Sequence, residues 1–198
     1  EIVVLGGDGM MLRAIRKHWR KRLPFVGFNA GHLGFLHNEP EHAEDVPKFF
    51  AQMRTYHLPL MRVDAVKTDG TTSTDYAFND VWIQRQRPAL WTEVSVNGRV
   101  RVPKLVSDVV LAATPAGSTA YARSMGATPM NLDRPALALA ASAVDSPRGW
   151  RHAELPGDAD IEFRALDPGS RPAEAHFDNA MIGTVERLRV RTSRIASV

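Results

Sequence analysis

The chain has no cysteine, little net charge and no long apolar run. Without cysteine, its 198 residues cannot form a disulfide framework, a thiolate nucleophile or a zinc–thiolate site. No apolar run approaches the roughly 20 residues of a membrane-spanning helix, and the N-terminus has no signal-peptide pattern. We therefore expect a soluble protein with no membrane partner, and we assign it to the cytoplasm.

The small net charge gives little reason to expect nucleic acid as a partner. Lys and Arg number 25 against 22 Asp and Glu, which leaves a net charge of +3. One basic segment, Arg13 to Arg22, contains no acidic residue. We interpret this segment as a solvated helix face, and an anionic ligand or phosphate beside it is the alternative.

The residue types that are present describe a folded chain. With 44% hydrophobic and 24% charged residues, the composition differs from those of disordered, collagen-like and coiled-coil proteins. The length fits one large domain or two small ones. The sequence texture favours two, an α/β domain at residues 1–57 and a β-rich domain at residues 58–198, with the option that the C-terminal end returns to the first domain.

The α/β domain is predicted to begin with a strand, a glycine turn and a helix. Residues 1–5 form a short run rich in β-branched residues that stops at Gly6-Gly7-Asp8-Gly9, and Met10 to Arg22 then show helical spacing. Because the chain begins inside a strand, we expect a preceding strand and helix to be missing from this numbering. The stripe of this helix that is predicted to be buried consists of Met11, Ile15 and Trp19.

A second strand and a second helix complete the predicted first domain. The apolar run from Pro24 to Asn29 predicts a parallel strand covered on both faces, and a glycine loop, Ala30 to Leu36, follows it. The residues from Asp45 to about Tyr56 predict a helix that Asp45 caps, with Pro47 in its first turn.

The second domain is predicted from short apolar or alternating runs that turns separate. Asn97-Gly98 is a strong hairpin signal, because both central positions of such a turn need positive φ. The Ala-rich segment Pro135 to Ala143 predicts a short helix. The expected strands are Leu60 to Val66, Tyr76 to Gln84, Val94 to Val102 around the Asn-Gly turn, Val109 to Ala113, Ile161 to Ala165 and Arg187 to Arg194.

The turn Gly6-Gly7-Asp8-Gly9 is the first candidate for chemistry. Glycines let backbone N–H groups approach a phosphate, and a helix N-terminus carries about half a positive charge. A carboxylate beside polyphosphate makes sense where Mg²⁺ intervenes or where an acceptor hydroxyl gives it a proton, and both situations belong to phosphoryl transfer. The alternative is a tight turn with Asp8 as the helix cap.

Polar clusters beside apolar strands are the other candidates. Thr114 to Tyr121 offers hydroxyls suited to ribose or phosphate, or simply a helix start. Asn79 and Asp80 fall in the predicted strand Tyr76 to Gln84, where adjacent side chains point to opposite faces, and a strand-end or bulge position is the alternative. Asp108 is either a strand-entry residue or a ligand carboxylate. The seven histidines lack metal-ligand spacing, so no protein metal site is predicted.

Four motifs in order resemble the NAD kinase family, also described as inorganic polyphosphate/ATP-NAD kinases. They are GGDG before a helix, GFNAGHLGFL, AFNDVWIQ and SDVVLAATPAGSTAYARSMGA, and the match covers nearly the whole chain. The resemblance implies an α/β N-terminal domain, a β-sandwich-like C-terminal domain and a site between them, in an NAD kinase/diacylglycerol kinase-like fold. It also implies a homodimer or homotetramer.

The reaction that this resemblance implies is ATP + NAD⁺ → ADP + NADP⁺, with the phosphate placed on the 2′-hydroxyl of the adenosine ribose. Mg²⁺ or another divalent cation would accompany ATP, and polyphosphate is the alternative donor. By the same resemblance Asp8 is the proton acceptor, Asn79 and Asp80 hold the adenosine end of NAD, and Asp108 meets the nicotinamide riboside. The other binding positions implied are Gly6, Gly7, Gly9, Ser118, Thr119, Ala120, Tyr121 and Ser124.

The chain departs from the family pattern on the loops that face substrate. Because of this placement, an altered donor or acceptor preference stays open, including NAD against NADH. The departures are Met10 for the threonine after GGDG, Asp80 for a glutamate one methylene longer, Val109 and Ala127 for glycines, and Asn179 for the glycine after Asp178.

Two other functions share parts of this pattern. Lipid and other hydroxyl kinases carry a similar GGDG loop, and they would place labelled phosphate in an organic extract and not in NADP. A non-catalytic dinucleotide-binding module would bind NAD, and the substitution Asp8→Asn would change no turnover.

Overall fold

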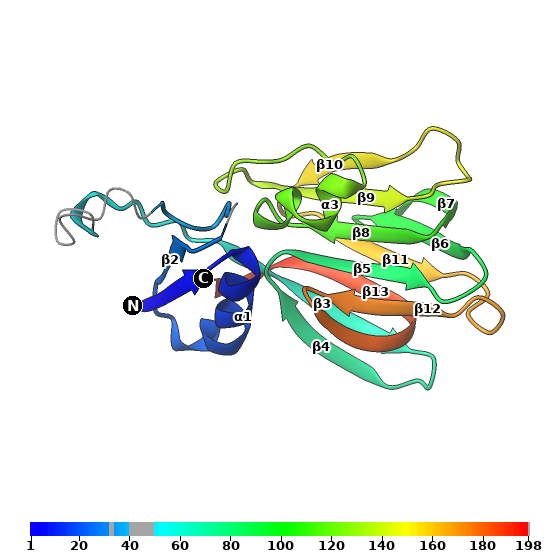
Figure 1. Ribbon diagram of the computed structural model, residues 1–198. Coiled ribbons are helices and arrows are strands. Elements are labelled where there is room, and N and C mark those ends of the chain that lie inside the picture. The colour runs from blue at the N-terminus through cyan, green and yellow to red at the C-terminus, as the bar shows by residue number, and fades with distance from the viewer. Residues whose placement is uncertain (32–33, 40–49, 198) are drawn as a thin grey trace. The chain divides into compact units, whose positions relative to one another are not determined.

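The computed structural model describes residues 1–31, 34–39 and 50–197, and the side chains of these residues as far as 193. The chain divides into two compact units, Glu1–Pro59 with Arg194–Val198, and Leu60–Ser193. We call them the N-terminal unit and the β unit, and describe each by itself (Figure 1). Within the described ranges, no helix combines the length and the apolar character that a membrane crossing requires.

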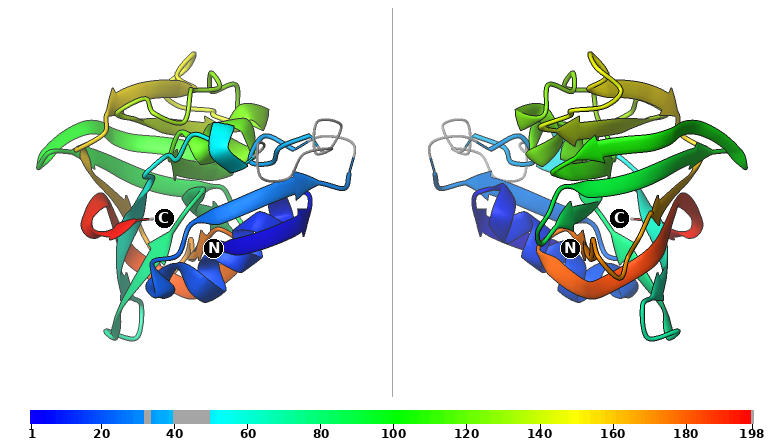
Figure 2. Two further views of the ribbon diagram at one scale, coloured as in Figure 1. Left: turned by 90° about the vertical axis from the view of Figure 1, so that its left-hand side faces the viewer. Right: turned by 90° about the vertical axis from the view of Figure 1, so that its right-hand side faces the viewer.

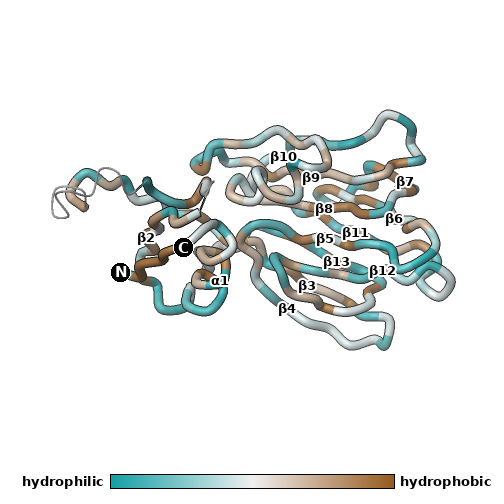
Figure 3. Tube along the Cα trace, in the orientation of Figure 1, coloured by the Kyte–Doolittle hydropathy of each residue, from teal (hydrophilic) through white to brown (hydrophobic). Residues whose placement is uncertain are grey.

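The N-terminal unit contains a β-strand, a helix and a parallel β-strand. β1 (Ile2–Gly6), which is apolar along most of its length (Figure 3), pairs in parallel with β2 (Phe25–Asn29). Between them lie α1 (Asp8–His18) and the short 3₁₀ helix η1 (Trp19–Lys21). Met11 and Ile15 are buried as predicted, whereas Trp19 is only half-buried because the α-helix ends before it.

The segment after the glycine loop runs alongside β2. Asn38 forms an isolated parallel bridge with Phe28, its N–H donates to Gly27 O (2.8 Å), and its carbonyl accepts the N–H of Asn29 (3.0 Å). These bonds fix Asn38 beside the end of β2. Of the helix predicted for Asp45 to about Tyr56, residues 45–49 lie outside the described residues, residues 50–52 are helical, and the remainder is not.

The β unit is built on one 11-stranded sheet in which most neighbouring strands are antiparallel. The strand order is β10-β9-β8-β5-β12-β13-β11-β6-β7, and β3 pairs with both β13 and β4. The early part of β13, orange in Figure 2, is strongly curved. The bounds are β3 (Pro59–Lys67), β4 (Thr72–Ala77), β5 (Asp80–Arg85), β6 (Leu90–Val96), β7 (Arg99–Ser107), β8 (Val109–Ala113), β9 (Ala136–Ser142), β10 (His152–Pro156), β11 (Asp160–Ala165), β12 (Ala173–Phe177) and β13 (Ala180–Ser197).

Strands β8 and β9 are buried on both faces. Alternate side chains enter the main core, where Val110 of β8 and Leu139 of β9 meet residues from β6, β7 and β11. The other side chains of β8 and β9, among them Leu111 and Ala140, pack beneath α3 (Tyr121–Ser124). The helix predicted for Pro135 to Ala143 is therefore wrong. The small alanine side chains suit a strand covered from both sides, and this packing outweighs their helix propensity.

Candidate functional site

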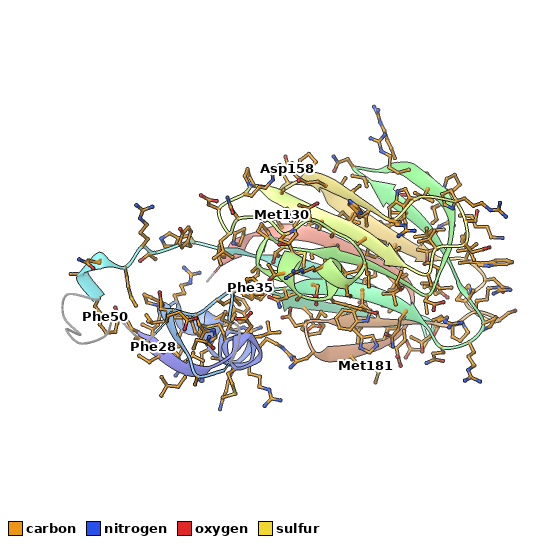
Figure 4. The ribbon with its side chains drawn as sticks, turned by 45° about the horizontal axis from the view of Figure 1, so that its top comes forward. Phe28, Phe35, Phe50, Met130, Asp158 and Met181 are labelled. Atoms are coloured by element: carbon orange, nitrogen blue, oxygen red, sulfur yellow. The ribbon has the colours of Figure 1, made fainter. Side chains whose placement is uncertain are left out.

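Asp8 lies where β1 gives way to α1, at the first residue of the helix. Gly7 and not Asp8 is the helix cap, because the Asp8 carboxylate points instead toward residues 35–36. Its Oδ2 accepts the backbone N–H of Phe35, a residue labelled in Figure 4, and its Oδ1 accepts that of Leu36, each at 3.0 Å. Since 32% of the side chain stays exposed, the carboxylate is both fixed in place and open to a ligand.

The three glycines of this turn are glycines for different reasons. Gly6 has φ +148°, and a Cβ there would lie 2.8 Å from Met10 Cγ, so the local fold requires it. Among the described residues, a Cβ on Gly7 or Gly9 would meet nothing within 4 Å. Packing against this part of the chain therefore does not explain these two glycines, and the lack of a side chain leaves the backbone accessible at both positions.

In the β unit, the chain bends at Phe78 and Asn79, between β4 and β5. The prediction of one continuous strand from Tyr76 to Gln84 is therefore wrong, and the alternative of a strand-end position is right. The Asp178 carboxylate accepts the backbone N–H groups of Phe78 (3.1 Å), Asn79 (2.8 Å) and Asp80 (3.4 Å). A single buried carboxylate thus satisfies the amides of the whole bend.

The turn after β8 locks onto the same bend. The Thr114 hydroxyl donates to Phe78 O (2.6 Å), and the Thr114 N–H donates to Asn79 O (2.9 Å). The N–H of Gly117 in turn donates to the Thr114 hydroxyl (3.2 Å) at the start of η3 (Ala116–Thr119). Residues 78–80, 114–117 and 178 therefore form one rigid group, which we call the bend cluster.

Within the bend cluster, the position of Gly117 has no room for a side chain. A Cβ there would lie 2.0 Å from the backbone oxygen of Asn79, and backbone has no free rotation by which it can give way. We expect Gly117→Ala to lower the free energy of unfolding of the β unit by about 3 kcal/mol or more, read as a lower thermal midpoint. Gly169→Ala is the matched control, since a Cβ there meets no atom of the described residues within 4 Å. Equal midpoints for both variants would contradict this account of the bend.

Asn79 and Asp80 are both buried in the bend. Asn79 Oδ1 has no hydrogen-bond partner among the described residues. Burial, followed by the negative charge of Asp178, raises the pKa of Asp80 to about 7, and the backbone N–H of Tyr121 opposes this rise by donating to the carboxylate. A polar ligand would thus find an unused acceptor beside a carboxyl group that changes charge near neutral pH.

The raised pKa of Asp80 makes the stability of the β unit depend on pH. Between about pH 4 and pH 7 the folded state holds a proton that the unfolded state has released, so stability falls as pH rises through this window. Asp80→Asn keeps the shape of the side chain and cannot ionise. Between about pH 5 and pH 8 we therefore expect its thermal midpoint to fall less than that of the parent chain. This corresponds to a difference on the order of a few kcal/mol in the free energy of unfolding. Parallel midpoints in the two proteins across this range would contradict the assignment.

Tyr121 is the first residue of α3 and lies beside the aromatic side chain of Trp82. Its ring meets Trp82 edge-on (5.7 Å between ring centroids), and Trp82 stacks on His176 (5.0 Å). Burial, and then the charges of Asp80 and Asp108, raise the pKa of Tyr121. The other predicted residues here, Thr119, Ala120 and Ser124, are exposed or half-buried.

The polar side chains of Ser118 and Asp108 are engaged by other parts of the protein. Ser118 is buried, and its hydroxyl donates to Pro115 O (2.6 Å) and accepts the N–H of Met130 (2.8 Å), a residue labelled in Figure 4. The Asp108 carboxylate, at the start of β8, pairs with the Arg85 guanidinium (2.9 Å). In the described parts of the chain, no group of three or more His, Asp or Glu side chains is placed to hold a metal ion.

Comparison with known proteins identifies the family. Residues 1–54 match the sequence profile of the ATP-NAD kinase N-terminal domain. A protein named NAD kinase from Xanthomonas campestris is 35% identical over 194 residues, 97% of this chain and 75% of the relative. The chain belongs to the NAD kinase family. An NAD kinase from Cereibacter sphaeroides is 37% identical, again over 75% of its length.

Solved structures show the same fold. The chain superposes on yeast NADH kinase complexed with NADH with a TM-score of 0.84 and 23% identity, covering 96% of this chain and 57% of the yeast chain. For an NAD kinase from Archaeoglobus fulgidus in complex with ATP, the TM-score is 0.78 with 24% identity, covering 98% of this chain and 75% of that one. The predicted family, the NAD kinase fold and the enzyme class are confirmed.

Proposed function

We propose that this NAD kinase transfers the γ-phosphoryl group of ATP to the 2′-hydroxyl of the adenosine ribose of NAD, with Asp8 as the proton acceptor. The observation that supports this role best is the Asp8 carboxylate itself, fixed by two backbone N–H groups and still partly open. As the ribose oxygen bonds to phosphorus, the bond between phosphorus and the β,γ-bridging oxygen breaks. The hydroxyl proton passes to Asp8 and ADP leaves.

The surroundings of Asp8 suit this step. Gly7 and Gly9 leave space for substrate against the backbone, and the N-terminus of the 11-residue helix α1 favours negative charge nearby. Phosphoryl transfer depends mainly on positioning and charge neutralisation, and a carboxylate that orients the acceptor hydroxyl is a recurrent part of kinase sites. We propose that Mg²⁺ arrives with the phosphates of ATP, since Mg²⁺ commonly binds through phosphates, water and few protein ligands.

We propose that the β unit recognises the dinucleotide. Asn79 Oδ1, which has no partner among the described residues, is suited to accept a hydrogen bond from an adenine amine or a ribose hydroxyl. The Asp80 carboxyl group is suited to accept a hydrogen bond from a second hydroxyl. Tyr121 offers a partly exposed ring. Further contacts proposed from the family resemblance are Asp108, Ser118, Thr119, Ala120 and Ser124. The Ser118 hydroxyl also has two protein partners, Pro115 O and the N–H of Met130.

The direct test is turnover by the purified full-length protein. NAD⁺ and MgATP are supplied, and NADP is detected with an NADP-specific dehydrogenase. Parallel reactions replace ATP by polyphosphate and NAD⁺ by NADH, which settles the donor and the acceptor. We expect NADP from NAD⁺ and ATP. Labelled phosphate that appears in an organic extract and never in a dinucleotide would overturn the proposal.

We also propose a homodimer or homotetramer and a functional division near residues 57–58, on the strength of the family resemblance. Sedimentation of the full-length protein measures the first, and a monomer at micromolar concentration would contradict it.

A further inference from the structure

The imidazole of His37 lies directly beside Asp8. Its Nδ1 is 3.3 Å from Asp8 Oδ1, and its side chain has 0% exposure. The second ring nitrogen, Nε2, is buried and has no hydrogen-bond partner among the described residues. No motif singled out this histidine, so its contact with Asp8 is information from the structure alone.

The imidazole ring of His37 packs directly against the backbone of β2 at Gly27. A Cβ on Gly27 would lie 2.7 Å from His37 Cδ2 and 2.9 Å from Cγ, so this part of β2 has room for the imidazole only because residue 27 is glycine. A Cβ on Gly34 would also come within 3.3 Å of His37 Cβ. The imidazole therefore has one well-defined position, which a functional contact requires.

The surroundings of the two ring nitrogens of His37 assign its tautomer. A hydrogen on Nε2 would be a buried donor without an acceptor, which is costly. A hydrogen on Nδ1 points at a carboxylate oxygen and forms a charge-assisted bond. We therefore assign the hydrogen to Nδ1, which makes His37 a donor to Asp8 Oδ1.

This assignment distinguishes the two oxygens of Asp8. Oδ1 accepts the backbone N–H of Leu36 (3.0 Å) and the ring Nδ1–H of His37, whereas the only donor to Oδ2 among the described residues is the backbone N–H of Phe35 (3.0 Å). A carboxylate oxygen has about two lone pairs, so Oδ1 is fully used and Oδ2 has one left. We propose that Oδ2 is the atom that receives the ribose proton, and that His37 is a positioning residue that holds Oδ1. This inference rests on the proposed role of Asp8.

Two substitutions separate positioning from mere packing. The side-chain N–H of asparagine stands as many bonds from Cα as Nδ1 does, whereas that of glutamine stands at the depth of Nε2. In the full-length enzyme we expect His37→Gln to lower kcat by about 10-fold to 10²-fold with KM for NAD changed by less than about threefold. We expect His37→Asn to keep kcat within about threefold of the parent enzyme, at a similar or lower thermal midpoint.

The outcomes are decisive in both directions. Full kcat in His37→Gln, or equal losses of kcat in both variants, would overturn the positioning role. A ¹⁵N spectrum of histidine-labelled protein gives an independent readout, and a hydrogen found on Nε2 of His37 would overturn the tautomer even if neither variant folds. Asp8→Asn in the same assays distinguishes failure of the proposed function from failure of this inference. If it retains full turnover the proposed function fails, and if only the His37 variants are unaffected this inference alone fails.

Discussion

Asp8→Asn is expected to lower kcat for NADP formation by about 10²-fold to 10⁴-fold, while the affinity for NAD changes only a few-fold. Asparagine keeps the shape of the side chain and one of its two acceptor oxygens, so it retains the bond from the N–H of Phe35 or from that of Leu36 and loses the other. It cannot accept the proton of the ribose hydroxyl, because an amide is a very weak base. Steady-state kinetics with NAD⁺ and MgATP, together with a binding isotherm for NAD, measure both effects.

Asp158→Asn is the control for this substitution. Asp158, labelled in Figure 4, is an exposed carboxylate in the turn between β10 and β11, far along the chain from the GGDG loop. The same chemical change there should leave kcat unaltered. A full rate in Asp8→Asn would refute the proton-acceptor role, and a loss of NAD affinity as large as the loss of kcat would move Asp8 from proton transfer to substrate binding.

Asp178→Ala is expected to cause a large loss of stability. It removes the acceptor of the backbone N–H groups of Phe78, Asn79 and Asp80, and buried donors without acceptors cost about 1–3 kcal/mol each. Part of the loss is offset, because the negative charge of Asp178 also disfavours the ionised form of Asp80. We expect a net decrease of about 3–4 kcal/mol in the free energy of unfolding of the β unit, measured with urea.

Asp178→Asn provides a graded comparison. It retains one side-chain oxygen, which can still accept the shortest of these bonds, that from Asn79 (2.8 Å). We therefore expect an intermediate loss of stability, with weaker NAD binding in both variants because the bend carries Asn79 and Asp80. Alanine and asparagine variants as stable as the parent protein would show that the bend does not depend on this carboxylate.

The sequence predicts those strands whose pattern is local. The apolar run Val109 to Ala113 is β8 with the same bounds, and the Asn97-Gly98 signal marks the turn between β6 and β7. The wrong prediction of a helix at Pro135 to Ala143 arises because the structure of this segment is determined by packing that is not local. Alternate alanines and leucines of β9 enter two different cores, and which cores exist depends on strands and a helix elsewhere in the chain. Local propensity carries no information about such packing.

For the site, the sequence points to the residues but not to their support. The glycines around Asp8 and the polar residues Asn79 and Asp80 stand out because they interrupt apolar strands. Asp178 is separated from the bend that it stabilises by about 100 residues, and His37 from Asp8 by 29. Contacts between such distant positions leave no periodic signal in a single sequence. An alignment that revealed paired changes could have found them.

The most direct test of the central claim is a structure of the full-length enzyme with NAD bound. The account predicts that the 2′-oxygen of the adenosine ribose lies within about 3.2 Å of Asp8 Oδ2, with the Phe35 N–H still on the same oxygen. A 2′-oxygen more than about 6 Å from the Asp8 carboxylate in every copy of the enzyme, beyond the reach of even one bridging water, would contradict it.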